Sequence, residues 1–227
     1  MVKGSPRFKP FIVLTLTALK LIIVSFVQKD LMARIKPHKN GTKKDLITQK
    51  AAALFRLKGY SSASMRHLAE QVGVEAPSLY NHIGSKSEIL QAICFKVANS
   101  FTFYLDSIDF KHAKSITLLE SIIRFHIKMM LTSFNEVYVA NHEWKHLKEP
   151  YLSNFLMQRR AYEKRLMEIM EAGMQAGELK KTNAYLSVLT ILSAVRGLEF
   201  LPARKKDISN TQLENNMVNH LLKGIIK

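Results

Sequence analysis

The sequence contains very little cysteine, proline or glycine, and each shortage excludes a class of structure. Its 227 residues include one cysteine (Cys94), six prolines and nine glycines. A lone cysteine excludes an intramolecular disulfide and a cysteine-rich zinc module, and it fits the reducing environment of the cytoplasm. Scarce glycine and proline favour long helices joined by short loops, and no stretch keeps the alternating pattern of a β-strand. We therefore expect an all-α, cytoplasmic protein.

Acidic residues are also in short supply. Against 34 lysines and arginines there are 18 aspartates and glutamates, which leaves a net charge of +16. Such a surplus favours a polyanionic partner, either a nucleic acid or an anionic membrane, over an inert basic surface. Residues 1–41 hold eight of the basic residues and one acidic residue, so residues 42–227 still carry +9. The 47% hydrophobic content suffices for one or two cores and argues against disorder.

The first 41 residues form a separate apolar and basic extension. Phe11–Val27 is apolar apart from its threonines, Ser25 and Lys20, and it follows three basic residues, as the apolar run of a signal-anchor does. It is shorter than the roughly 20 residues of a membrane span, and Lys20 lies near its centre. A cytoplasmic helix is a second interpretation. A third, which we favour, is a start codon assigned too far upstream, with Met32 opening the chain on a short basic arm.

Residues 42–83 have the pattern of three short helices. The predicted helices cover 42–58, 65–71 and 75–83. Thr42 and Ser64 stand at N-cap positions, and Asp45 is a capping-box partner for Thr42. Gly73 can take a positive φ and make a tight turn between the second and third helices. Two helices joined by such a turn form a helix-turn-helix, whose last helix can lie in the major groove of DNA.

The rest of the chain predicts longer helices. Their expected ranges are 86–105, 114–134, 136–147, 151–176, 182–200 and 210–226. Ser85 and Glu88 have the spacing of a capping box at the start of the first of them.

Residues 59–90 carry a specific resemblance. The stretch GYSSASMRHLAEQVGVEAPSLYNHIGSKSEIL resembles, without a gap, the DNA-binding domain of the TetR family of bacterial transcription repressors. It includes the R-x-L-A of the second helix, the V-G-V turn, the S-L-Y of the recognition helix and the S-K-S-E-I-L that enters the next helix. The resemblance implies a helix-turn-helix DNA-binding domain at 42–88 and a helical ligand-sensing and dimerisation domain at 89–227. We expect no cofactor and no catalysis.

The resemblance also implies DNA contacts at particular positions. The residues concerned are Ser64, Arg66, Ala76, Pro77, Ser78, Tyr80, Asn81, His82 and Lys86. Ala76, Pro77 and Ser78 open the recognition helix and should face base edges. Tyr80 and His82 match positions that hold the phosphate backbone, and Lys86 should pair with a phosphate at the start of its helix. Ala63 departs from the threonine that many members have there, which removes one hydroxyl.

His142-Glu143-Trp144-Lys145-His146 matches the H-E-x-x-H pattern of zinc hydrolases. On one helix, His142 and His146 would share a face and could hold zinc, with Glu143 as general base. Lys145 places a cation inside the motif, and the candidate third ligands Glu163, Glu168 and Glu171 are marked only by their distance along the chain. We therefore keep a zinc-dependent hydrolase as an alternative function and expect no metal.

A second, looser resemblance concerns the ligand. The segment EWKHLKEPY at 143–151 resembles one found in TetR members that sense lipid-derived or acyl-CoA-like molecules. Phenylalanines and methionines crowd the middle helices, as in adaptable apolar pockets, although an ordinary core has the same composition. The candidate ligand-binding residues are Phe101, Phe125, His126, Met129 and Trp144.

The last two helices carry an apolar set that a second copy of the chain could share. Its members are Leu186, Leu189, Leu192, Val195, Leu213, Met217, Val218, Leu221 and Leu222. By resemblance these helices pair with their twins in a homodimer, which would present two recognition helices to a near-palindromic operator in double-stranded DNA. An effector that prefers another spacing of the two would release the DNA. If Phe11–Val27 is a genuine anchor, the alternative is a membrane-anchored DNA-binding regulator.

Overall fold

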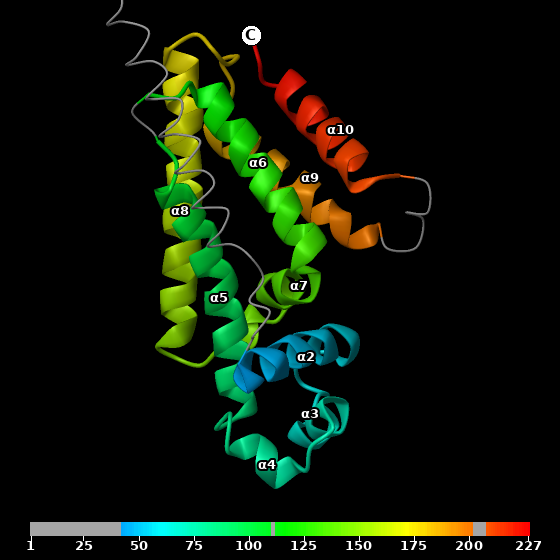
Figure 1. Ribbon diagram of the computed structural model, residues 1–227. Helices are drawn as coiled ribbons and strands as arrows, with labels where there is room; N and C mark the ends of the chain where they lie inside the picture. Colours follow the sequence, from blue (N-terminus) through cyan, green and yellow to red (C-terminus); the bar gives the residue numbers. More distant parts are fainter. Residues whose placement is uncertain (1–41, 110–111, 202–207) are drawn as a thin grey trace, which may run out of the picture. The chain divides into compact units, whose positions relative to one another are not determined.

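The computed structural model describes residues 42–109, 112–201 and 208–227 (Figure 1). The predictions about residues 1–41, including Phe11–Val27 and Met32, lie outside the described residues. Regular structure in the described part is helical. Its elements are α2 (Lys43–Lys58), α3 (Met65–Val72), α4 (Ala76–Tyr80), α5 (Lys86–Asp106), α6 (Ser115–Thr132), α7 (Phe134–His142), η1 (Trp144–His146), α8 (Tyr151–Gln175), α9 (Ala184–Arg196), η2 (Gly197–Phe200) and α10 (Asn210–Lys223). The all-α prediction is confirmed.

The first helices of the described part begin at the predicted N-caps. The Thr42 hydroxyl accepts a hydrogen bond from the Asp45 N–H, and the Asp45 carboxylate accepts one from the Thr42 N–H, so the capping box is complete. Ser64 caps α3 in the same way by accepting from the His67 N–H. At α5 only half of the predicted box forms. Ser85 accepts from the Glu88 N–H, whereas the Glu88 carboxylate accepts from the N–H of Gly84.

Three predicted helices are shorter or broken. α4 ends at Tyr80 rather than at residue 83, because Asn81 onward turns to bring the chain to Gly84 and the cap of α5. The expected helix 136–147 divides at Glu143 into α7 and η1, and the expected helix 182–200 tightens into η2 after Arg196. One antiparallel bridge between Leu179 and Ile226 joins the segment after α8 to the C-terminal segment.

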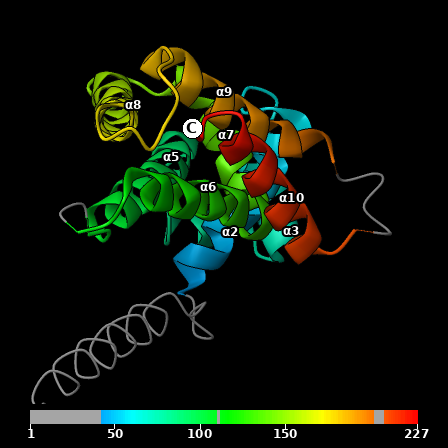
Figure 2. The same cartoon turned by 90° about the horizontal axis from the view of Figure 1, so that it is seen from above.

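The helices pack in two groups that share one continuous core. α2, α3 and α4 lie together at the lower end in Figure 1, and α5 leads from them into the larger group. There α5 packs against α7 and α8, while α6 packs against α8, α9 and α10. Figure 2 shows α8 and α10 on opposite flanks, with α6 and α9 between them. α7 contacts both α2 and α5, so it joins the two groups a second time.

The core is filled by aliphatic side chains with few polar interruptions. Ile47, Phe55, Leu79 and Leu90 are among those that are at most 1% exposed. They come from α2, α4 and α5 and belong to the same core cluster as the buried residues of the larger group. Among the helices of the described ranges, none combines the length and the hydrophobicity that crossing a membrane requires.

Candidate nucleic-acid interface and ligand cavity

The predicted recognition helix, α4, is held by one buried side chain and is open on its other side. Leu79 is fully buried, whereas Pro77, Asn81 and His82 are exposed and Tyr80 is 52% exposed. Gly73 makes the turn before it with a φ of 74°, and its N–H reaches the carbonyls that end α3. The polar face of α4 is therefore presented away from the core.

The other predicted DNA contacts on α3 and α4 differ in their exposure. Arg66 on α3 is 86% exposed and only loosely paired, with 3.5 Å between its Nε and the Glu70 carboxylate. Ser64 is exposed at the cap of α3, and Ala76 and Ser78 are half-buried on α4. The polar groups of Arg66 and Tyr80 are thus accessible to a binding partner, whereas the Ser64 hydroxyl already accepts a hydrogen bond as the N-cap of α3.

Lys86 has an internal role that the sequence did not reveal. Its Nζ donates to the carbonyl oxygens of Tyr60, Ser61 and Ala63, at 2.9, 3.3 and 2.8 Å, and lies 4.4 Å from the centre of the Tyr60 ring. An ammonium has three protons to donate, so these three carbonyls saturate it. In this DNA-free form Lys86 ties the start of α5 to the loop that precedes α3.

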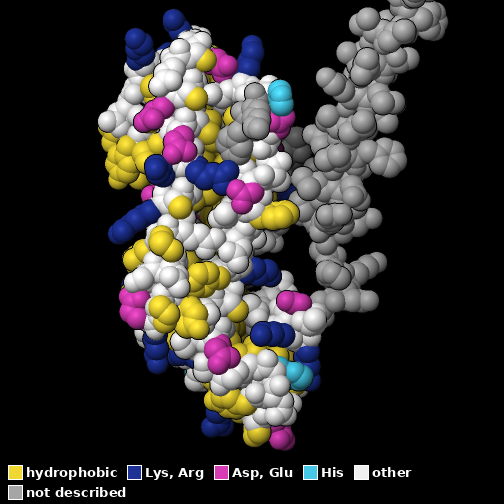
Figure 3. All heavy atoms as spheres, turned by 90° about the vertical axis from the view of Figure 1, so that its left-hand side faces the viewer, with side chains coloured by type: hydrophobic (Ala, Val, Ile, Leu, Met, Phe, Trp, Pro, Cys, Tyr) yellow, Lys and Arg dark blue, Asp and Glu magenta, His cyan; other side chains and the backbone are white. Residues whose placement is uncertain are grey.

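Positive charge is spread over the protein rather than gathered at α4. Residues 42–88 contain seven basic and four acidic residues, so only +3 of the +9 on residues 42–227 belongs to them. On the face shown in Figure 3, lysine and arginine side chains are scattered along the whole length. The net charge therefore agrees with a polyanionic partner but does not locate its binding surface.

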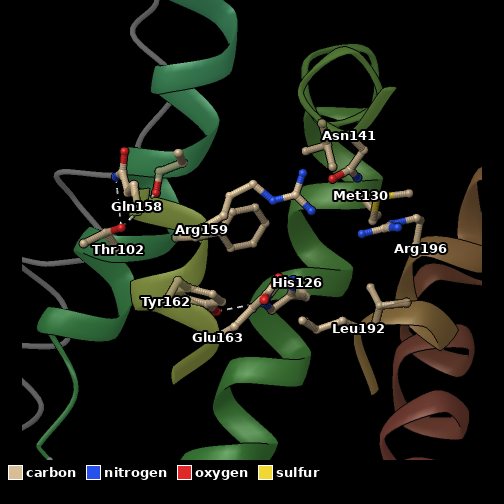
Figure 4. A pocket seen from close by; sticks show the side chains of 14 residues that line it. Thr102, His126, Met130, Asn141, Gln158, Arg159, Tyr162, Glu163, Leu192 and Arg196 are labelled. Carbon is tan, nitrogen blue, oxygen red and sulfur yellow. Dashed lines mark hydrogen bonds between the residues drawn. The ribbon is translucent and has the colours of Figure 1, made fainter. Parts of the chain in front are cut away.

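A cavity lies inside the larger helical group, where α5, α6, α7, α8 and α9 meet (Figure 4). Its volume is about 100 Å³, which is smaller than the roughly 300–1,000 Å³ of typical small-molecule sites. Its walls combine apolar and polar side chains. They are Ala98, Phe101, Thr102, His126, Met130, Val137, Asn141, Gln158, Arg159, Tyr162, Glu163, Leu192, Val195 and Arg196.

His126 is a neutral polar group in the cavity wall. Its Nε2 is 2.8 Å from the Tyr162 hydroxyl, and its ring stacks on Phe101 with 4.3 Å between centroids. Burial lowers the pKa of His126 to about 3 and raises the pKa of Tyr162. At neutral pH both groups are therefore uncharged.

Two arginines supply most of the charge in the cavity. In Figure 4, Arg159 of α8 and Arg196 of α9 point toward one another across the cavity. The pKa of Arg159 is lowered, first by burial and then by the charge of Arg196, while Glu163 raises it. Across residues 42–109, 112–201 and 208–227, no carboxylate forms an ion pair or hydrogen bond with either guanidinium.

Two of the five predicted ligand residues, Phe101 and His126, line the cavity. Phe125 lies one ring away, stacked on Tyr104 at 3.9 Å and edge-on to Phe101 at 5.7 Å. Met129 and Trp144 pack against the core without lining the cavity.

The sequence reasoning missed Arg159, Tyr162 and Arg196. The first two lie three residues apart on α8 and so face the same way. This three-residue spacing, at the segment RAYEK, is the sequence feature that could have identified Arg159 and Tyr162 as neighbours on one helix face. Arg196 had no comparable signal, because only the fold brings α9 beside α8.

The histidines of the H-E-x-x-H motif bind different partners. α7 ends at His142, whose Nε2 is 2.9 Å from the Glu199 carboxylate. His146 lies in η1, 3.3 Å from Glu143, and stacks on Tyr60 with 5.1 Å between centroids. Because the helix breaks between them, the two imidazoles do not stand one turn apart on one α-helical face. In the described part of the chain no cluster of three or more potential metal ligands occurs.

The candidate third ligands are also separate. Glu163 lines the cavity, and Glu168 is 3.9 Å from Lys164 on the exposed side of α8. Glu171 is exposed one turn further along the same helix.

Apolar side chains are exposed in a row along α9 and η2. Tyr185, Leu186 and Leu189 are 56, 57 and 47% exposed, at spacings that place them on one side of α9. Phe200, at the end of η2, is 83% exposed. Other members of the predicted dimer set face inward: Leu192 lines the cavity, and Val195, Val218 and Leu222 are buried. Leu213, Met217 and Leu221 are half-buried on α10.

Two family models match the chain. Residues 47–93 match the model described as bacterial regulatory proteins, tetR family, and residues 114–199 match the tetracyclin repressor-like C-terminal domain. None of the curated protein sequences compared with the chain matches it. Together, the two models cover the helix-turn-helix and most of the larger helical group, and the chain belongs to the TetR family of DNA-binding transcription regulators.

Solved structures of regulators have the same fold. KstR2, a ketosteroid transcriptional regulator of Mycobacterium tuberculosis, is 17% identical with a TM-score of 0.76; the alignment covers 82% of this chain and 96% of that one. AibR, in complex with isovaleryl coenzyme A and operator DNA, is 21% identical with a TM-score of 0.68; the alignment covers 80% of this chain and 98% of that one. PfmR from Thermus thermophilus is 21% identical with a TM-score of 0.68; the alignment covers 78% of this chain and 97% of that one. At these identities the likeness establishes the fold.

Proposed function

We propose that this protein is a dimeric repressor that leaves its operator when a small molecule occupies the cavity. One observation carries the proposal: two walls of the cavity belong to the two helices that hold the DNA-binding group. α5 contributes Phe101 and α7 contributes Val137 and Asn141, and both helices pack against α2. A ligand that shifts either wall therefore acts directly on the support of α4, to the extent that it prefers one arrangement over the other.

We assign DNA binding to the open side of α4 and its surroundings. Ala76, Pro77 and Ser78 read base edges, and Tyr80, His82 and Asn81 contact the backbone. Arg66 and Ser64 reach DNA from α3. The exposure of Pro77, Tyr80, Asn81 and His82 supports this assignment. Lys86 acts mainly by holding the loop before α3, through its three carbonyl contacts.

The exposed row on α9 and η2 supports a homodimer. Tyr185, Leu186, Leu189 and Phe200 are large apolar side chains that a monomer would leave in water. A two-fold interface there would be isologous and would present two recognition helices. The matching operator is a near-palindrome in double-stranded DNA.

The effector is lipid-derived or acyl-CoA-like. The cavity has apolar walls against which an acyl chain can pack, including Phe101, Met130 and Leu192. AibR, which has the same fold, was solved with isovaleryl coenzyme A. We propose no catalytic role for His142 and His146, whose separate carboxylate partners argue against the zinc-hydrolase alternative. A regulator of chromosomal genes works in the cytoplasm.

The test is operator binding by matched tyrosine variants. Operator fragments are recovered by mapping binding sites across the genome, and affinity is measured by fluorescence anisotropy. Tyr80→Ala should weaken binding about tenfold, as loss of a phosphate contact does. Tyr151→Ala, which removes an exposed tyrosine of α8, should not. Equal affinities of wild type and Tyr80→Ala would refute the DNA-binding face.

A further inference from the structure

The cavity contains two arginines whose charges face each other without a carboxylate between them. Arg159 reaches in from α8 and Arg196 from α9 (Figure 4). Their mutual repulsion contributes to the lowered pKa of Arg159. Arg159 is half-buried, whereas Arg196 is exposed. Glu163, one helical turn after Arg159, raises the pKa of Arg159 but forms no ion pair with it, and a charge partly removed from water is costly to leave unpaired.

The charged side chains that line the cavity determine the sign of its net charge. Arg159 and Arg196 are positive, and Glu163, one helical turn after Arg159, is negative. His126 adds no charge, since burial holds its pKa near 3. The remaining lining residues are neutral, so the cavity carries one net positive charge.

The polar and apolar walls are also arranged in a definite way. In Figure 4 the two guanidinium groups lie near Asn141 and Met130, while the His126–Tyr162 pair lies to one side of them. Gln158 is held by Thr102 and Asn99, at 3.1 and 2.9 Å, and so contributes a fixed amide. Phe101, Val137, Leu192 and Val195 supply apolar surface. Such a site suits a molecule with one charged end and an apolar body.

We propose that the effector is an amphiphile with an anionic group bound between Arg159 and Arg196 and an apolar body against the helix walls. The guanidinium forks suit the oxygens of a carboxylate or a phosphate, which they can grip by paired hydrogen bonds. The anionic group is either the carboxylate of a free acid or a phosphate of a coenzyme A thioester. This inference rests on the proposed function and adds the chemical class of the effector.

Three series of linear probes test the charge, each spanning four to twelve carbons: carboxylates, primary alcohols and primary amines. Coenzyme A thioesters of the same acids form a separate arm. Isothermal titration calorimetry on the full chain measures affinity. We expect a carboxylate or its thioester to bind at least about tenfold more tightly than the alcohol of equal length, with the amine weakest. Binding of free acids assigns the anion to the carboxylate, and binding of thioesters alone assigns it to a phosphate.

Substitutions locate the anion. Arg159→Gln and Arg196→Gln should each weaken binding of the best anionic probe about tenfold or more, whereas Arg160→Gln, at the exposed neighbour on α8, should not. Glu163→Gln should tighten binding, because it removes the one negative charge among the lining residues. An alcohol or amine that binds as tightly as the acid, failure of every anionic probe to bind, or unchanged affinity in both arginine variants would overturn the inference.

Operator binding by the same preparations separates this inference from the proposed function. Variants that still bind operator DNA are folded, so a change in probe affinity belongs to the cavity. A wild type that binds operator but fails with every anionic probe contradicts the anionic effector and leaves the repressor proposal standing. A wild type that binds no operator contradicts the repressor proposal itself.

Discussion

Replacing Lys86 with methionine separates a structural clamp from a DNA contact. Methionine keeps much of the apolar stem but removes the ammonium that donates to the carbonyls of Tyr60, Ser61 and Ala63. If those contacts are the main role of Lys86, the variant loses stability even without DNA. If the ammonium serves mainly to bind phosphate, stability in the absence of DNA stays as it was.

The magnitude follows from the three contacts. Hydrogen bonds to charged groups contribute about 1.5–3 kcal/mol each, but Lys86 is half-buried, so each is worth less here. Fixing the lysine side chain costs up to about 2 kcal/mol of entropy. A net loss of about 2 kcal/mol remains, which lowers the Tm by about 4–8 °C for a chain of this size.

Differential scanning calorimetry of Lys86→Met in DNA-free buffer measures this loss. Lys58→Met, at an exposed lysine at the end of α2, is the matched control and should leave the Tm unchanged. Operator affinity at several salt concentrations completes the test: a lost phosphate contact lowers the slope of log affinity against log salt by about one. An unchanged Tm together with a reduced slope would refute the clamp.

Three further predictions concern packing, assembly and pH. Gly173→Ala should cost about 1–3 kcal/mol in urea unfolding, since an added Cβ would lie 2.6 Å from Leu179 Cδ1 and 2.7 Å from Ser115 Cβ; a neutral effect would contradict this packing. Leu189→Asp should weaken dimerisation roughly a hundredfold in analytical ultracentrifugation by placing a charge in an apolar interface, whereas Lys164→Asp, at an exposed position of α8, should not. Because the pKa of His126 is about 3 when folded and near 6.5 when unfolded, the unfolded state binds the extra proton below pH 6.5 and stability falls as pH drops toward 3. His126→Gln should therefore lose about 1–2 kcal/mol less than wild type between pH 7 and pH 5, and equal losses in urea unfolding would contradict the burial of His126.

Local patterns predicted the small DNA-binding group well because its boundaries depend on neighbouring residues. The Thr42–Asp45 box and the Gly73 turn are interactions within four residues, and both form as expected. α4 is the exception, since it ends at Tyr80 although its pattern continues to Ile83. Ile83 is buried without being helical, so burial alone explains its apolar character.

The cavity could not be assembled from the sequence, because its walls come from five helices. Phe101 and His126 were identified by their chemistry, yet Met129 and Trp144 have similar chemistry and pack elsewhere. On α6, His126 and Met130 face the cavity while Met129 does not. The four-residue spacing of the first pair shows the lining face, but only the position of α8 decides which face that is.

α5 connects the two sites as a single helix. Lys86, at its first position, holds the loop before α3, and Phe101, fifteen residues later, stacks on His126 in the cavity wall. At 1.5 Å per residue these points are about 22 Å apart along a stiff rod. Because Lys86 fastens the first end of α5 to the loop before α3, we expect a displacement of the wall at Phe101 to move α3 and α4 as well. α5 can transmit the presence of a ligand only if the cavity end has two packings, and the stacked rings of Phe101 and His126 are where these packings would differ.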